Sequence, residues 1–88
     1  MACYIVTYDL RAPGRDYENV HNKLKSYTKW AKVTESTWAI VTEDKAVVIR
    51  DALKAIVDPN DRIFVVKSGV EAAWFNSKCK NEWLKANL

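Results

Sequence analysis

The sequence predicts an α+β domain with the element order strand, helix, strand, strand, helix, strand and a C-terminal extension. Three observations indicate this fold class. β-Branched and aromatic residues form four short runs. Apolar residues recur at helical offsets in two segments between those runs. Turn residues interrupt the pattern at Pro13-Gly14 and Asp58-Pro59. We therefore interpret residues 1–88 as a single domain.

The first predicted elements are a strand and a helix. Residues 3–9 (Cys-Tyr-Ile-Val-Thr-Tyr-Asp) are typical of a central strand, which ends at the carboxylate of Asp9. After the Pro13-Gly14 turn, Asp16 can cap a helix. The apolar face of this helix is formed by Tyr17, Val20, Leu24 and Tyr27.

A hairpin and a second helix follow. Residues 30–33 and 37–42 are two β-rich runs joined by a short polar link, as in a hairpin. Asp44 stands where it can cap the second helix. The apolar positions of that helix are Ala46, Ile49, Leu53 and Ile56. Proline cannot continue the helix, so the chain turns into a fourth strand at residues 63–66.

The last segment, residues 77–88, is interpreted as a short helix or extension anchored by Trp83 and Leu84. The preceding order is that of the ferredoxin-like βαββαβ fold, a four-stranded antiparallel sheet with two helices on one face. We expect the other face to be uncovered. Because its strands are rich in aromatic residues, we expect this face to bind a ligand or to pack against a second copy rather than to be solvated. A second copy would make the protein a homodimer.

Composition limits the classes of function. Fourteen basic and eleven acidic side chains give a formal net charge of +3, which permits contact with phosphates without demanding it. No apolar run approaches the ~20 residues that span a bilayer, so we expect no membrane association. Cys3 and Cys79 are far apart and belong to no Cys-x-x-Cys motif. This predicts neither a zinc site nor a disulfide framework and favours the cytoplasm.

Asp9 is the first candidate for a catalytic or metal-binding residue. A carboxylate at the end of a central strand is rigidly held yet within reach of solvent. Magnesium takes one or two protein carboxylates and several waters, so two Asp9 side chains at a twofold axis could share an ion. The alternative is that Asp9 ends the strand and caps the following turn through backbone amides.

Basic and aromatic residues suggest contacts with nucleic acid, each with an alternative. Arg11 and Arg15 flank the Pro13-Gly14 turn and could hold a phosphate near Asp9, or could be solvated. Tyr8 and Trp38 on neighbouring strands could stack bases, or could pack in the core or a dimer interface. Four further lysines could contact nucleic acid or form a wet surface, namely Lys23, Lys25, Lys29 and Lys32.

Four motifs carry a resemblance to a known family. They are Tyr-Ile-Val-Thr-Tyr-Asp-Leu at residues 4–10, Ser36-Thr37-Trp38, Asp58-Pro59-Asn60-Asp61 and Trp83-Leu84. Together they resemble the small SinR-like proteins related to the CRISPR-associated protein family two. The resemblance covers residues 3–87, and each motif is short.

The resemblance implies a ferredoxin-like homodimer in which Asp9 lies near the dimer axis and binds magnesium for cleavage of RNA or DNA phosphodiesters. VapD toxins share the fold and are ribonucleases. CRISPR-associated members can instead act as adaptors that hold DNA between integrase subunits, without use of the aspartate. Arg11 and Arg15 match the family's arginines only loosely. We therefore expect either a dimeric magnesium-dependent endonuclease or a non-catalytic dimeric module that binds nucleic acid or protein.

Overall fold

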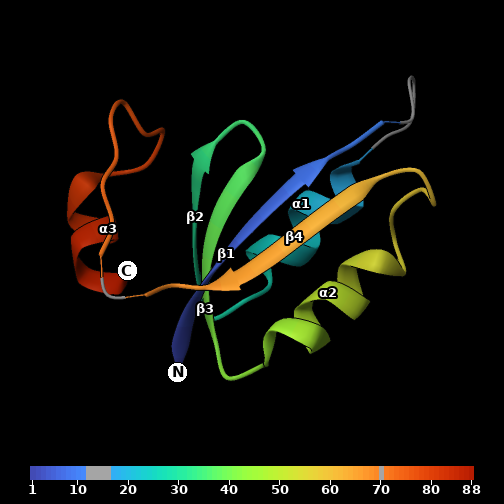
Figure 1. Ribbon diagram of the computed structural model, residues 1–88, viewed down its shortest axis with the longest axis horizontal. Helices are drawn as coiled ribbons and strands as arrows, with labels where there is room; N and C mark the ends of the chain where they lie inside the picture. The colour runs from blue at the N-terminus through green and yellow to red at the C-terminus, as the bar shows by residue number, and fades with distance from the viewer. Residues whose placement is uncertain (12–16, 70) are drawn as a thin grey trace.

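The computed structural model describes residues 1–11, 17–69 and 71–88. The elements are β1 (Ala2–Asp9), α1 (Glu18–Lys25), β2 (Lys29–Thr34), β3 (Thr37–Thr42), α2 (Ala46–Lys54), β4 (Arg62–Lys67) and α3 (Asn81–Asn87). The strands form one antiparallel sheet in the order β2-β3-β1-β4. α1 and α2 lie on one face of the sheet and α3 lies on the other (Figure 1). The predicted α+β, ferredoxin-like arrangement is confirmed.

The main core lies between the sheet and the two helices α1 and α2. Because successive side chains of β1 alternate between the two faces of the sheet, those of Tyr4, Val6 and Tyr8 point toward these helices. Val6 lies opposite Trp38 on β3 and opposite Val65 on β4, so three strands contribute to the same layer. The helices contribute buried residues at helical spacing, namely Val20, Leu24, Ile49 and Leu53. These are positions that the periodicity of the sequence predicts.

The start of α2 differs from the prediction. Lys45, with extended backbone, occupies the N-cap position and makes no side-chain cap hydrogen bond. The backbone N–H of Asp44 donates instead to Thr42 Oγ1 at 3.1 Å. Asp44 thus lies in a local turn one residue before the N-cap position, so the prediction that Asp44 caps α2 is wrong. The other predicted cap, Asp16, lies outside the described residues, and Tyr17 is at the N-cap position of α1.

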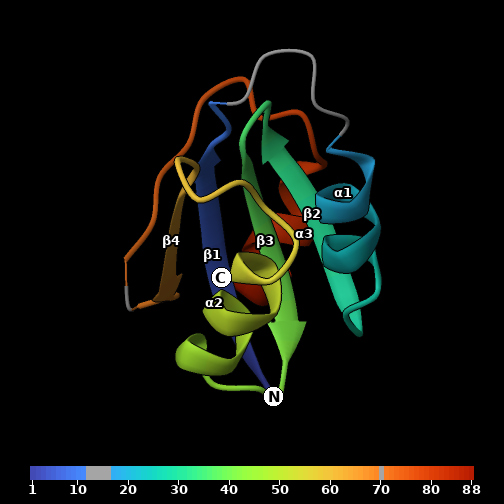
Figure 2. The same cartoon turned by 90° about the vertical axis from the view of Figure 1, so that its right-hand side faces the viewer.

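The segment after β4 crosses the sheet face that we expected to be uncovered. Figure 2 shows α3 behind β2 and β3, on the side away from α1 and α2. The backbone N–H of Lys78 donates to the carbonyl oxygen of Val33 at 2.8 Å, which fastens this segment to β2. Leu84 of α3 is 1% exposed. The expectation of a wholly uncovered face is therefore wrong, because α3 covers its β2–β3 part.

The β1–β4 part of that face retains exposed apolar side chains. Ile5 on β1 lies opposite Val66, and Thr7 lies opposite Phe64. Phe64 is 61% exposed and Val66 is 44% exposed.

Within the described residues, no helix has the length and apolar character needed to span a membrane.

The core contains a buried hydroxyl group, that of Tyr27, whose removal is expected to stabilise the protein. The Tyr27 hydroxyl is buried and has no hydrogen-bond partner among the described residues, and burial raises its pKa. Since an unsatisfied buried hydroxyl costs about 1–3 kcal/mol, Tyr27→Phe is expected to raise the free energy of unfolding by about 1 kcal/mol. Urea denaturation measures this change.

Tyr8→Phe is the matched control for this prediction. It removes a hydroxyl that accepts a hydrogen bond from Trp38 Nε1 at 3.0 Å. Stability should therefore fall in this variant by about 1 kcal/mol. If Tyr27→Phe lowers stability to the same degree, the Tyr27 hydroxyl is satisfied and the interpretation is wrong.

Candidate functional site

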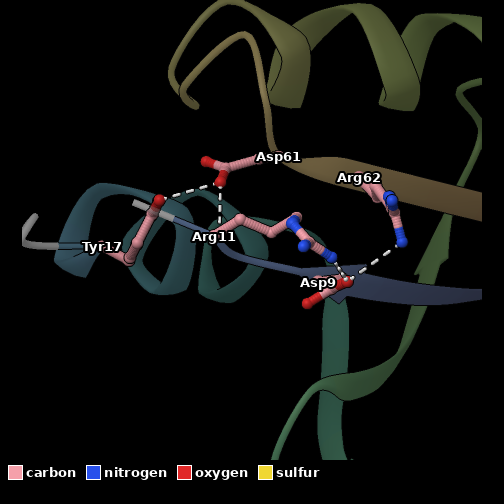
Figure 3. A network of polar contacts seen from close by, with 5 residues as sticks. All are labelled: Asp9, Arg11, Tyr17, Asp61 and Arg62. Carbon is pink, nitrogen blue, oxygen red and sulfur yellow. Dashed lines mark hydrogen bonds and ion pairs between the residues drawn. The ribbon is translucent and has the colours of Figure 1, made fainter. Parts of the chain in front are cut away.

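Asp9 lies at the end of β1, opposite Arg62 at the start of β4. Its Oδ2 atom accepts a hydrogen bond from Arg11 Nη1 at 3.1 Å and lies 3.6 Å from Arg62 Nη1 (Figure 3). The three side chains are about half exposed or more. The end of the β1–β4 pair therefore presents one carboxylate and two guanidinium groups to solvent.

A second aspartate, Asp61, links chain segments that lie next to the Asp9 site. Asp61 Oδ1 accepts hydrogen bonds from the backbone N–H of Arg11 at 2.6 Å and from the Tyr17 hydroxyl at 2.9 Å (Figure 3). Its Oδ2 atom accepts from the backbone N–H of Asp58 at 2.8 Å. Asp61 thus joins the segment after β1, the start of α1 and the turn before β4. The sequence indicates only that Asp61 belongs to a turn.

The predictions for the residues near Asp9 compare differently with the structure. Arg11 contacts Asp9, in agreement with its predicted position beside the carboxylate. Arg15 lies outside the described residues, as does the turn that Asp9 was expected to cap. Arg62 was not a candidate, because its contact with Asp9 depends on strand register between two distant segments. Among the residues that the structure describes, Arg11 and Arg62 contact Asp9.

Tyr8 and Trp38 lie in the core beneath α1. Trp38 is 1% exposed and Tyr8 is 8% exposed. The Tyr8 hydroxyl accepts a hydrogen bond from Trp38 Nε1 and donates one to the Glu35 carbonyl oxygen at 3.4 Å. Burial raises the pKa of Tyr8, and the hydrogen bond from Trp38 lowers it by less. Rings this deeply buried offer no face to a nucleobase, so the structure favours packing over base stacking.

The donor set at Asp9 limits how a metal ion could bind. In the described part of the chain, no three His, Cys, Asp or Glu side chains form a group that could hold a metal. Both arginine contacts go to Oδ2 of Asp9, and Oδ1 points away from them (Figure 3). Asp9 of one chain therefore offers a single oxygen that is free of these arginine contacts. This fits magnesium only where waters, a phosphate or a second carboxylate complete the shell.

Comparison with protein families identifies the family of this chain. Residues 1–77 match the family described as CRISPR associated protein Cas2. The chain belongs to this family. The Cas2 match includes every strand of the sheet and ends before α3. Neither a curated protein nor a solved structure matches the chain. The resemblance is thus confirmed for Cas2, and the narrower SinR-like assignment stays a prediction.

Proposed function

We propose that this Cas2-family protein is a homodimer that binds the phosphodiester backbone of RNA or DNA at the Asp9 end of its sheet. The observation that carries the proposal is the pair of exposed guanidinium groups, Arg11 and Arg62, on a single carboxylate oxygen. Guanidinium forks match the geometry of phosphate oxygens and bind them with charge-assisted hydrogen bonds. This is the non-catalytic alternative that the sequence left open.

The two arginines have the capacity to take a phosphate without leaving Asp9. Each guanidinium has five N–H donors, and the contacts with Asp9 use one nitrogen of each. The other N–H donors of each guanidinium group remain for a phosphate. Asp9 then acts as the group that holds Arg11 and Arg62 close to each other.

The exposed part of the sheet face supports the homodimer. Phe64 and Val66 form an apolar strip on β4, and Arg62 and Asp9 lie at one end of the same face. A twofold interface must be complementary to itself. This surface carries apolar side chains together with a positive and a negative group, so a rotated copy can oppose unlike charges. Such packing would draw the two Asp9 sites toward a common axis.

A second candidate function is magnesium-dependent cleavage of the bound strand. The observation that favours it is that Asp9 Oδ1 points away from both arginine contacts (Figure 3). A magnesium ion, when bound, would supply a Lewis acid for phosphodiester hydrolysis. In this case Asp9 would hold the ion, the Asp9 of a second copy would complete the carboxylate pair, and Arg11 and Arg62 would orient the phosphate.

Binding of labelled RNA and DNA oligonucleotides tests the proposed function. Arg11→Ala and Arg62→Ala are each expected to weaken binding by about tenfold, because charge-assisted hydrogen bonds contribute about 1.5–3 kcal/mol. Arg50→Ala is the matched control, since Arg50 is an exposed arginine of α2 paired with Asp51. The proposal fails if all three variants bind as the unchanged protein does.

Asp9→Asn separates binding from cleavage. An asparagine oxygen can still accept hydrogen bonds from Arg11 and Arg62, and the substitution removes a negative charge beside the phosphate site. Affinity without metal should therefore stay the same or rise. If the protein also cleaves the oligonucleotide with magnesium, the same variant should lose that activity. Cleavage that persists in folded, dimeric Asp9→Asn protein would remove the second candidate and leave the first.

A further inference from the structure

A second basic surface lies at the other edge of the sheet, between β2 and the segment that precedes α3. A groove of about 370 Å³ opens there. Trp30 and Trp83 line it together with Lys32, Lys78 and Lys80. Its described lining contains no carboxylate. Lysines and tryptophans that are distant in the sequence are therefore gathered in one depression.

The aromatic part of this groove is held in place by packing. The ring of Trp30 lies 5.6 Å from the ring of buried Trp38, and Trp30 itself is 40% exposed. Trp83 is partly exposed on α3, next to Leu84, whose burial fixes the helix on the sheet. The two indoles lie on opposite faces of the sheet, because Trp30 pairs with Ile40 on the face covered by α1 and α2, whereas Trp83 belongs to α3. They line the groove from the two sides of the edge strand β2, and part of each stays accessible. Such groups are typical platforms for unpaired nucleobases.

The lysines supply positive charge around the indoles. Lys25 of α1 is outside the groove lining, with its Nζ atom 5.5 Å from the centre of the Trp30 ring. Lys78 Nζ donates a hydrogen bond to Glu35 Oε1 at 2.8 Å, and Lys32 Nζ lies 3.9 Å from Glu35 Oε2. The hydrogen bond and the charge of Lys78 lower the pKa of Glu35, so its carboxylate is charged at neutral pH. Glu35 therefore compensates part of the positive charge beside the groove.

We propose that this lysine–tryptophan groove is a second site that binds single-stranded nucleic acid, with phosphates on the lysines and a base on an indole. Single strands present both groups at once. A duplex keeps its bases stacked inside, so the tryptophans would gain no partner. An acidic peptide would use the lysines and leave the indoles without a planar ligand. Lys78, Lys80 and Trp83 lie beyond the residues matched to Cas2, so one side of the groove comes from a segment outside that match.

The affinity of the protein for a labelled oligothymidylate, measured in variants with opposite changes of charge, tests the groove proposal. Lys80→Glu should weaken binding about tenfold at low salt and reduce the slope of log affinity against log salt by about one. Glu35→Gln should strengthen binding, because it releases Lys78 and Lys32 from a carboxylate. Lys54→Glu, on exposed α2, is the matched control and should change affinity much less.

A change to one indole tests base stacking separately from charge. Trp83→Leu keeps an apolar side chain on α3 and should weaken binding about tenfold, since stacking contributes about 1–3 kcal/mol per base. Circular dichroism checks that the variant is folded. The groove proposal is overturned if this variant and Lys80→Glu both bind as Lys54→Glu does. It is also overturned if duplex DNA or poly-glutamate binds the groove with equal affinity and the same response to these substitutions.

The proposals for the two binding sites can be rejected separately. Arg62 is at the Asp9 end of β4 and lines no part of the groove. If Arg62→Ala weakens binding and Lys80→Glu does not, only the groove is rejected. If Lys80→Glu weakens binding and Arg11→Ala and Arg62→Ala do not, only the proposed function of the Asp9 end is rejected.

Discussion

Replacing Leu84 with alanine is expected to lower the free energy of unfolding by about 3 kcal/mol and to release α3 from the sheet. The side chain is 1% exposed, and loss of a buried leucine costs about 2–5 kcal/mol through lost burial and the cavity left behind. α3 has seven residues and cannot persist as an isolated helix in water. Its stability therefore comes from this packing.

Urea denaturation and amide hydrogen exchange of residues 81–87 measure the two effects of Leu84→Ala. Lys85→Ala changes an exposed neighbour on the same helix and should alter stability by less than about 0.5 kcal/mol. The exposed hydrogen bond from Trp74 Nε1 to Asn81 Oδ1 is too weak to hold α3 alone. If α3 keeps its protection in Leu84→Ala, other contacts hold it and Leu84 is not its anchor.

The elements of this fold could be predicted because their signals are local. Val20 and Leu24 repeat at helical spacing, and both are fully buried in α1. The face on which α3 packs could not be predicted in this way. A short helix with Leu84 as its buried residue is compatible with either side of a sheet, and the choice depends on tertiary contacts such as the one between Lys78 and Val33.

The site shows the same division between local and long-range information. Asp9 is recognisable as a carboxylate that ends a strand, and Arg11 is near it in the sequence. The contribution of Arg62 follows from the pairing of β1 with β4, which no local pattern encodes. Alternation along β1 places Tyr8 on one face and Asp9 on the other, but it does not say which face the helices cover. The burial of Tyr8 and Trp38 therefore required the assembled structure.

Phe64→Glu is expected to weaken the proposed homodimer by at least about 100-fold. Phe64 is 61% exposed in the apolar strip, and burial of a phenylalanine contributes about 1.5–3 kcal/mol. A twofold interface contains the residue twice, and the substitution also introduces two charges that would need to be desolvated. Sedimentation equilibrium over a range of concentrations measures the association constant.

Val47→Glu is the matched control for this substitution. Val47 is 49% exposed on α2, on the opposite side of the sheet, so its change to glutamate should leave the dimer intact. A protein that stays monomeric at high concentration would reject the homodimer. Dissociation by Val47→Glu but not by Phe64→Glu would place the interface on the helical side.

The same Phe64→Glu variant distinguishes the two functions considered for Asp9. Phosphate binding by Arg11 and Arg62 uses groups of one chain, so the monomeric variant should retain it with reduced affinity, because two linked sites become one. Magnesium-dependent cleavage by a pair of Asp9 carboxylates needs both copies and should disappear with the dimer. Cleavage by the monomer at the rate of the unchanged protein would show that one Asp9 suffices, and the shared-ion hypothesis would then be wrong.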